Sequence, residues 1–311
     1  MNGTVLVLAH GESLANGLGS TITHQKNRAQ QLADSLLPIL DSNLKLMVMH
    51  GNKTQVGFVL FRSELANHVL HAIPLDVCGA DTQGATGYML SQSINNALKR
   101  RQNSREVLCL LTQTVVDTNV PEEKISQRAI GPWFDREKAD NYRQMRGWTI
   151  IEEPGRGYRR AVPSYPVKKI LELKQITELV ERQTIVIAGG GGGIPVIQND
   201  DGDYQGIEAV VESEQIVPII AKSIQAKVLI LVIENENKYI REGLNPQKPT
   251  LISFSDLTKL KDNTQIISDT VKRSIRVAHD FLSGGGEQVI ITPLRTLPGI
   301  FDGKSGLRIG A

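Results

Sequence analysis

Glycines follow three apolar runs of the chain, and each turn of this kind could hold an anion. Residues 10–12 (His-Gly-Glu) follow Val-Leu-Ala, residues 50–52 (His-Gly-Asn) follow Met-Val-Met, and residues 189–193, all glycine, follow Ile-Val-Ile-Ala. Glycine lets backbone N–H groups approach an oxyanion, and a following helix N-terminus adds a favourable dipole. A single glycine is also typical of an ordinary tight turn, so the glycine run carries the most weight. If the turns share one sheet edge, they predict an anion site.

Two familiar nucleotide motifs and a metal set are not found. The run at 189–193 lacks the G-x-G-x-x-G spacing and the later acidic residue of a dinucleotide site. Gly303-Lys304-Ser305 resembles the end of a P-loop, but Pro298 stands where the upstream glycine belongs. No further His, Cys or carboxylate shows ligand spacing around His10 and His50, so we expect no metal site built by the protein.

Each glycine turn must follow the end of a strand, and short apolar runs predict strands that end at these turns. Continuous Val, Ile and Leu runs suit strands buried on both faces of a parallel sheet. Strand alternating with helix predicts an open, doubly wound α/β fold. The predicted strands are 4–9, 45–49, 107–111, 184–188, 227–233 and 288–292, and the predicted helices are 24–40, 84–101, 173–182, 212–225 and 268–283.

One segment interrupts this alternation. From about 118 to 166 the chain is charged, aromatic and rich in turns, and it carries both tryptophans, Trp133 and Trp148. A polar insertion between buried strands predicts a protruding subdomain or lid, with a long surface loop as the alternative.

The composition is that of a globular protein. The 311 residues are 40% hydrophobic and 22% charged, with a formal net charge of +2. This balance does not favour nucleic acid as a partner. Cys78 and Cys109 form no metal or redox spacing and indicate a reducing compartment. Without a recognisable leader or an apolar run of about 20 residues, we expect a soluble cytoplasmic protein that does not bind membranes.

Taken in order, the motifs resemble carbamate kinase, a branch of the amino acid kinase family. The resemblance covers nearly the whole chain, and its motifs are specific in combination. They are His50–Gly57, Pro74–Cys78, Thr82-Gln83-Gly84, Thr112–Asp117, Ile130-Gly131-Pro132, Gly155–Arg160, Val162-Pro163-Ser164, Gly190–Val196 and Glu208-Ala209-Val210.

The resemblance implies an enzyme that transfers a phosphoryl group between ATP and carbamate, giving ADP and carbamoyl phosphate. It implies ATP or ADP with Mg²⁺ as cofactor, a small-molecule substrate and a homodimer. The implied fold is a three-layer αβα sandwich with a mainly parallel central sheet. A single domain would then span residues 1–311, with the lid inserted at about 118–166.

The resemblance also implies roles for particular residues, of three kinds. The expected catalytic residues are Lys272, Arg128 and Glu214. The expected substrate-binding residues are Gly11, Glu12, Gly51, Asn52, Lys53, Gly190 and Gly191. The expected nucleotide-binding residues are Glu212, Ser213, Val232, Ile233 and Val271.

The sequence departs from the family pattern at chemically important positions. Glu12 stands in place of asparagine, Lys53 in place of glycine, and Arg128 in place of the lid lysine. The family's Asp-Lys-Asp is Glu-Ser-Glu at 212–214, and its Thr-Asp is Val-Ile at 232–233. Each lost electrostatic stabiliser can cost about 10²- to 10³-fold in rate.

These departures leave other interpretations open. One is a carbamate kinase-like protein that has lost catalysis and binds an anion or a protein partner, and another is a kinase for a different small carboxylate. Lys272 is also interpretable as an ordinary solvated lysine. The acids at 212 and 214 are also interpretable as residues of the first turn of a helix, where the helix dipole favours them.

Overall fold

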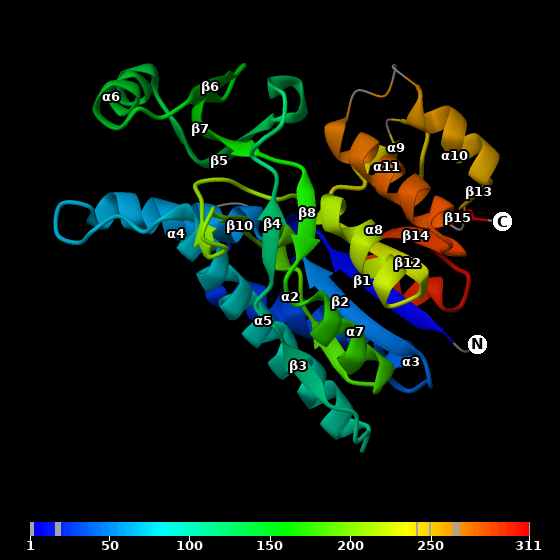
Figure 1. Cartoon of the computed structure of the whole chain (residues 1–311). Helices are drawn as coiled ribbons and strands as arrows, with labels where there is room; N and C mark the ends of the chain where they lie inside the picture. The colour runs from blue at the N-terminus through cyan, green and yellow to red at the C-terminus, as the bar shows by residue number, and fades with distance from the viewer. Residues whose placement is uncertain are drawn as a thin grey trace.

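The structure is a computed structural model of the 311-residue chain, and it describes residues 3–15, 20–240, 242–248, 250–263, 266 and 268–310. An eight-stranded sheet forms its centre (Figure 1). Parallel pairings join β14, β12, β1, β2, β9 and β3, while β15 runs antiparallel to β14. In spatial order the strands are β13 (Thr250–Ile252), β15 (Leu307–Gly310), β14 (Gln288–Pro293), β12 (Ala226–Ile233), β1 (Thr4–Ala9), β2 (Lys45–His50), β9 (Ile185–Ile187) and β3 (Val107–Cys109).

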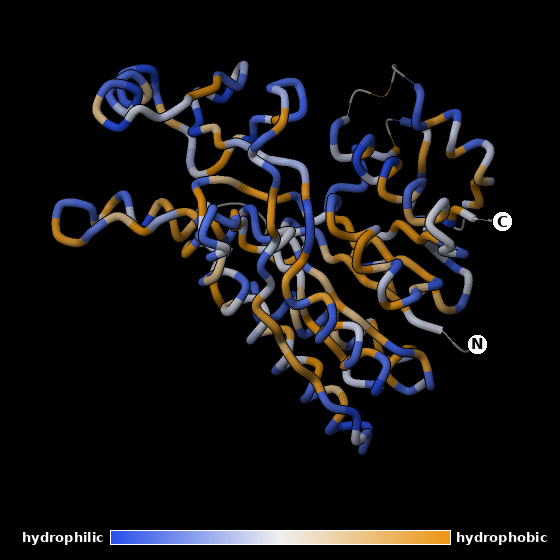
Figure 2. Tube along the Cα trace, in the orientation of Figure 1, coloured by the Kyte–Doolittle hydropathy of each residue, from blue (hydrophilic) through white to orange (hydrophobic). Residues whose placement is uncertain are grey.

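Helices cover both faces of this sheet, so the fold is a three-layer αβα sandwich. Side chains alternate along β1: Leu6 and Leu8 belong to the core on one face, and Val5 and Val7 to the core on the other. Figure 2 shows hydrophobic residues concentrated along the central strands. The first core includes residues from α7 (Leu173–Glu181), α8 (Ser213–Ser223), α9 (Asn237–Ile240), α10 (Phe254–Lys261) and α11 (Asp269–Ser283). The second includes residues from α1 (Gly11–Leu14), α2 (Ile22–Ser35), α3 (Leu37–Leu40), α5 (Leu75–Arg100) and the 3₁₀ helix η3 (Leu294–Ile300).

The predicted strands and helices are confirmed in place and type. The predicted helix at 24–40 is divided into α2 and α3, with Pro38 in the first turn of the second helix. The helix predicted at 84–101 begins earlier, at Leu75. Several helices were not predicted, among them α6 (Arg136–Arg146), α10 and α4 (Lys53–Ala66), which follows the turn at 50–52 directly.

Two smaller sheets lie beside the main one. A four-stranded sheet has the order β11 (Tyr204–Gly206), β10 (Ile194–Gln198), β4 (Gln113–Val116) and β8 (Val167–Ile170). The polar segment 118–166 forms an antiparallel sheet of β5 (Ser126–Phe134), β7 (Gly157–Ser164) and β6 (Ile150–Glu153), with helix α6 (Arg136–Arg146) and the 3₁₀ helix η1 (Glu122–Lys124). Figure 1 shows this sheet and α6 extending from the αβα body.

Aromatic side chains hold α6 against its sheet. Tyr142 stacks on Trp148 with ring centroids 4.7 Å apart, and Phe134 lies 4.9 Å from Tyr142. The guanidinium of Arg160 lies over the Trp148 ring at 4.5 Å. The concentration of aromatic residues in this segment therefore has a structural reason, because a small sheet needs large side chains to form a core.

Candidate active site

The turns after β1 and β2 meet at the carboxyl edge of the main sheet. The N–H of His10 donates to the Val232 carbonyl at 2.9 Å, and the N–H of Gly51 donates to the Ala9 carbonyl at 2.8 Å. A Cβ added to Gly51 would lie 2.5 Å from the backbone nitrogen of Gly11. Only glycine allows this approach, so the two turns form one surface.

The glycine run follows β9 and includes the 3₁₀ turn η2 (Gly190–Gly192). Gly191 has φ +65°, and a Cβ on it would lie 2.1 Å from Oδ1 of Asn52. A Cβ on Gly190 would lie 2.6 Å from the His50 ring. Glycine is therefore required at these two positions, because the run lies too close to the β2 turn for a larger side chain. Among the described residues, the N–H groups of Gly11, Gly190 and Gly191 have no hydrogen-bond acceptor, so they are available to an anion.

Helix α5 braces these turns from one side. Thr82 accepts a hydrogen bond from the Asn52 amide at 2.9 Å. Gln83 donates to the Thr112 carbonyl at 3.1 Å and accepts from the Thr112 N–H at 2.8 Å. The Thr112 hydroxyl in turn accepts from the Gly189 N–H at 2.8 Å. All these side chains are buried, so the Thr-Gln motif fixes the turns relative to one another.

Glu212, at the N-cap of α8, joins two cations at this edge. Its Oε1 lies 3.1 Å from Nζ of Lys53, and its Oε2 lies 2.8 Å from Nη2 of Arg128. Only 6% of its side chain is exposed. Burial favours the protonated form, but the cations of Lys53, Arg128 and Arg273 outweigh it and hold the pKa of Glu212 below its ordinary value. Glu212 is therefore ionised at neutral pH, and it orients both cations.

Helix α11 contributes a cation that the sequence analysis missed. Nε of Arg273 lies 3.6 Å from Oε1 of Glu214 in the first turn of α8. Lys272, the predicted catalytic lysine, is exposed, and its side chain contacts no other described residue through a hydrogen bond or an ion pair. Because neighbours on a helix point in different directions, one residue decides which side chain reaches Glu214. An arginine next to the predicted lysine was the available signal.

Two histidines lie beside the turns. Burial lowers the pKa of His50 to about 4, and Nδ1 of His50 lies 3.3 Å from the Gly51 carbonyl. Burial also lowers the pKa of His10, against the opposing charge of Glu214. Within the described part of the chain, Nε2 of His10 is buried without a hydrogen-bond partner. Both rings are therefore neutral at pH 7.

The other predicted residues differ in exposure. Glu12 points outward, with 59% of its side chain exposed and its Oε2 3.9 Å from Nζ of Lys238. Its charge is thus shared with a cation and with solvent. The side chains of Val232, Ile233 and Val271 are 0%, 2% and 0% exposed and lie in the cores. They support the site from beneath, so their assignment to nucleotide binding stays a prediction that only backbone groups could fulfil.

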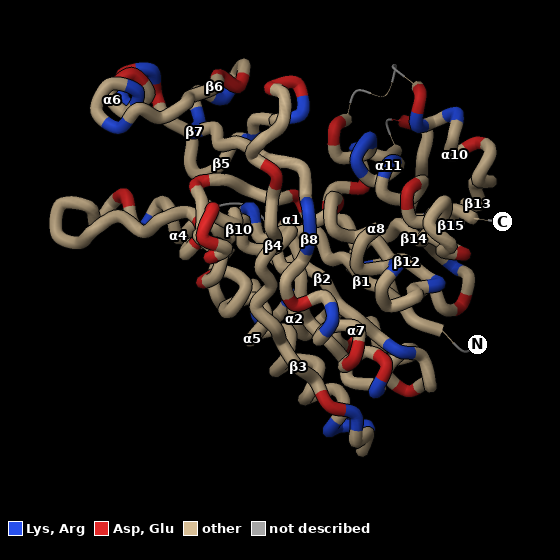
Figure 3. Tube along the Cα trace, in the orientation of Figure 1, with Lys and Arg blue, Asp and Glu red and all other residues tan. Residues whose placement is uncertain are grey.

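Three arginines of the segment 118–166 bind glutamates of the αβα body. Arg128 pairs with Glu212 as described. Arg146, at the end of α6, lies 2.9 Å from Glu64 of α4. Arg160 of β7 pairs with Glu208, which also accepts a hydrogen bond from the Leu75 N–H. A small apolar cluster joins the same parts, with Ile130 and Val162 packed against α4 and α5. Figure 3 shows charges of both signs along this segment.

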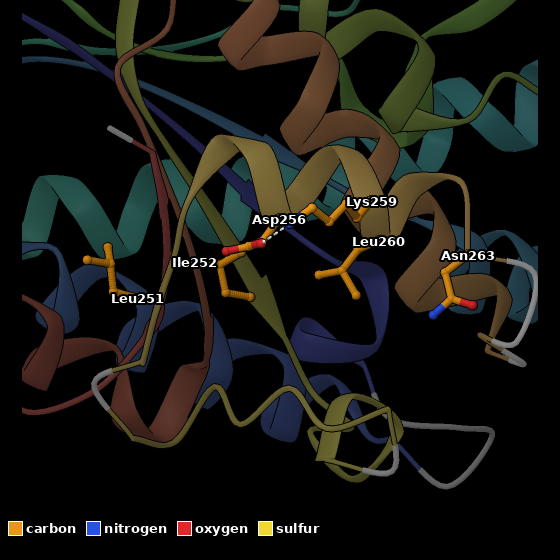
Figure 4. Close-up of a pocket in the computed structure, with 6 residues that line it drawn as sticks. All are labelled: Leu251, Ile252, Asp256, Lys259, Leu260 and Asn263. Carbon is orange, nitrogen blue, oxygen red and sulfur yellow. Dashed lines mark hydrogen bonds and ion pairs between the residues drawn. The ribbon is translucent and has the colours of Figure 1, made fainter.

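Two cavities lie away from this edge of the sheet. One of about 490 Å³ lies between the edge strand β13 and α10, where Asp256 and Lys259 form an ion pair at 3.0 Å (Figure 4). A second of about 1060 Å³ lies at the amino ends of the strands, lined in part by Thr4, Lys45 and Ala226. No cluster of three or more metal-ligating side chains, and no helix suited to crossing a membrane, occurs among the described residues.

Glycine turns at the carboxyl edge of a parallel sheet, with cations oriented by buried acids, are typical of α/β proteins that bind anions. Residues 17–293 match the family model described as the amino acid kinase family. The chain is 34% identical to the carbamate kinase-like protein YahI of Escherichia coli over 99% of each chain, and 32% identical to carbamate kinase of Thermococcus kodakarensis over 99% of each. It resembles the structure of Giardia lamblia carbamate kinase bound to AMP-PNP, with 25% identity, 99% and 98% coverage and a TM-score of 0.86. The chain therefore belongs to the amino acid kinase family, and within that family it groups with the carbamate kinases.

Proposed function

We propose that this chain is a carbamate kinase, which transfers a phosphoryl group between ATP and carbamate. The observation that carries the proposal is the buried Glu212 carboxylate, which orients Lys53 and Arg128 beside the glycine turns. Phosphoryl transfer needs positioning and positive charge more than covalent help from the protein. Full-length relatives that are themselves carbamate kinases support the same reaction.

In this proposal the described residues divide the work. The N–H groups of Gly11, Gly190 and Gly191 hold the substrate anion, and Asn52 shapes the turn that contacts it. A carbamate oxygen attacks the γ-phosphorus of ATP while the bond to the β-phosphate oxygen breaks. Lys53 and Arg128 oppose the charge on the moving phosphoryl oxygens, and Glu214 orients Arg273 toward the same region.

ATP and Mg²⁺ fit the charges at this edge. AMP-PNP, bound by the Giardia lamblia relative, is an ATP analogue, which supports nucleotide binding in this family. Mg²⁺ usually keeps several waters and takes substrate phosphates plus one or two protein carboxylates. The exposed carboxylate of Glu12 fits such an ion, and the ion would neutralise part of the phosphate charge. Lys272, exposed at the start of α11, stays a candidate contact for the nucleotide phosphates.

The segment 118–166 serves in this proposal as an inserted lid on a single domain spanning residues 1–311. Arg128 links the lid strand β5 directly to the site through Glu212. A lid that closes over the substrate excludes water during transfer, which protects the unstable carbamoyl phosphate.

A homodimer in the cytoplasm completes the proposal. Apolar side chains gather at the end of α4 and just after it, where Leu65, Val69 and Leu70 are 62%, 75% and 61% exposed. Figure 2 shows the end of α4 extending away from the body, with hydrophobic and hydrophilic residues along it. Exposed apolar groups of this size favour a protein contact.

A second candidate is a carbamate kinase-like protein that binds an anion without transferring phosphate. Ser213 and the buried Val232 and Ile233 favour it, because Ser213 supplies no charge and the two apolar side chains supply no polar group to a nucleotide. A kinase for another small carboxylate is the third.

One assay separates these candidates. ATP formation from ADP, carbamoyl phosphate and Mg²⁺ is coupled to hexokinase and glucose-6-phosphate dehydrogenase. We expect turnover with the wild type. Saturable binding of carbamoyl phosphate in calorimetry without turnover would support the binding protein, and neither binding nor turnover would point to another substrate.

A further inference from the structure

Lys53 occupies a position suited to contact a ligand. It is the first residue of α4, so the positive end of that helix dipole lies beside it. One of its three ammonium donors is used by Glu212, and 61% of the side chain is exposed. The other donors therefore face the space outside the buried carboxylate. A lysine held by a buried acid at one donor and open at the others is oriented without being neutralised.

Position 213, next to Glu212, lacks a cation. Ser213 begins α8 and is 7% exposed. A lysine at this position is what the resemblance implies, within an acid-lysine-acid series. In this chain the carboxylate of Glu212 instead receives a lysine from α4, at 3.1 Å. The cluster thus has three cations and two acids: Lys53, Arg128, Arg273, Glu212 and Glu214. Moving the lysine from position 53 to position 213 would leave the net charge of this cluster unchanged.

We propose that Lys53 contacts the phosphoryl group together with Arg128, and that α4 supplies it in place of a lysine at position 213. The inference rests on the proposed function, because it assigns a role within the same site. It explains how the chain tolerates serine between two acids. It also implies that adding a lysine at 213 to the wild type gives no gain, since another cation would then share the Glu212 carboxylate with Lys53 and Arg128.

The test compares Lys53→Met with the double variant Lys53→Met, Ser213→Lys. Lys53→Met keeps most of the side-chain length and removes the charge. We expect it to lower turnover in the coupled assay by about 10²-fold and to weaken orthophosphate binding in calorimetry by roughly tenfold. The double variant should recover at least tenfold of the lost turnover. Lys53→Arg keeps the charge on a different head group, so it should lose less turnover than Lys53→Met. Lys304→Met is the matched control, because Lys304 is an exposed lysine in a loop, paired only with Asp302 among the described residues, and it should change neither quantity.

Each outcome decides the inference. Wild-type turnover and phosphate affinity retained in Lys53→Met would overturn it and leave the proposed function intact. A wild type without turnover whose phosphate affinity still depends on Lys53 would reject the proposed function and keep the anion contact. A folded double variant whose turnover stays as low as that of Lys53→Met would refute the claim that Lys53 replaces a lysine at position 213. If circular dichroism shows that the double variant does not fold, Lys53→Arg decides, and turnover as low as in Lys53→Met would overturn the role of the charge.

Discussion

Glu212→Gln tests whether one buried charge holds the site and the lid together. The substitution keeps the shape and one acceptor oxygen, but it removes the charge that Lys53 and Arg128 share. Hydrogen bonds to charged groups contribute about 1.5–3 kcal/mol, and the partner side chains are 61% and 31% exposed, so solvent screening places the loss near the low end. We expect the free energy of unfolding at pH 7 to fall by about 1–2 kcal/mol.

The effect of Glu212→Gln depends on pH with a definite sign. The pKa of Glu212 in the folded protein lies below its ordinary value of 4.5, so the ionised carboxylate stabilises the fold above that value. Its contribution is lost as the pH falls through the folded pKa. The difference between wild type and Glu212→Gln should therefore be full at pH 6–7 and disappear in stronger acid.

Urea denaturation followed by circular dichroism measures the difference, and hydrogen exchange reports on the lid. Amides of β5 should exchange faster in Glu212→Gln, because Arg128 loses its charged partner. Glu208→Gln is a matched control that breaks the Arg160 pair, where the carboxylate is 50% exposed, and it should cost less. Equal unfolding free energies for wild type and Glu212→Gln at pH 7, or a difference that persists in acid, would refute this reasoning.

Three further predictions test the turns, α11 and the buried imidazole. Gly191→Ala should lower the free energy of unfolding in urea by more than about 2 kcal/mol, because the added methyl group clashes with Asn52 and the residue has a positive φ. Gly155→Ala, with φ +76° and open space around it, should cost only about 1–2 kcal/mol. Equal costs for the two variants would contradict the packing argument. Arg273→Met should lower turnover at saturating substrate by about 10²-fold; a loss in Lys272→Met alone would return the role to Lys272. In an NMR titration His50 should stay neutral from pH 5 to 8, since burial lowers its pKa to about 4 from 6.5. The free energy of unfolding should therefore be unaffected by His50 above pH 6.5 and should decrease as the pH falls toward 4, because the unfolded chain binds the proton first. Protonation with a midpoint above 6 would contradict this.

The sequence predicted the sandwich because the buried strands carry an unusually direct signal. Val5–Ala9 is apolar on both faces, and only a sheet covered on both sides gives such a run. The segment 118–166 was recognised as different because charge and aromatic residues interrupt the alternation. The strand pairing within it depends on contacts between residues far apart in the sequence, such as Ser126 with Ser164, and no local pattern specifies them.

The site was predicted only in part, because some of its features are local in the sequence and others depend on long-range contacts. Glycine turns are local features, so the turns at 10–12, 50–52 and 189–193 were found. The pairing of Lys53 with Glu212 joins residues 159 positions apart and depends on how α4 and α8 meet. Whether Lys272 or Arg273 faces Glu214 depends on the rotation of α11, which the apolar face of the helix sets. Sequence spacing alone could not distinguish them.

The cations around Glu212 have one proposed role above all: they stabilise the phosphoryl group during its transfer. The most direct measurement is ³¹P NMR of carbamoyl phosphate and ADP with Mg²⁺, in the presence of the wild type or Arg128→Met. We expect the carbamoyl phosphate resonance to fall as the ATP γ-phosphate resonance rises, and Arg128→Met to slow this exchange by about 10²-fold. Carbamoyl phosphate that binds the wild type but yields no ATP resonance, or equal rates in the two proteins, would contradict this role.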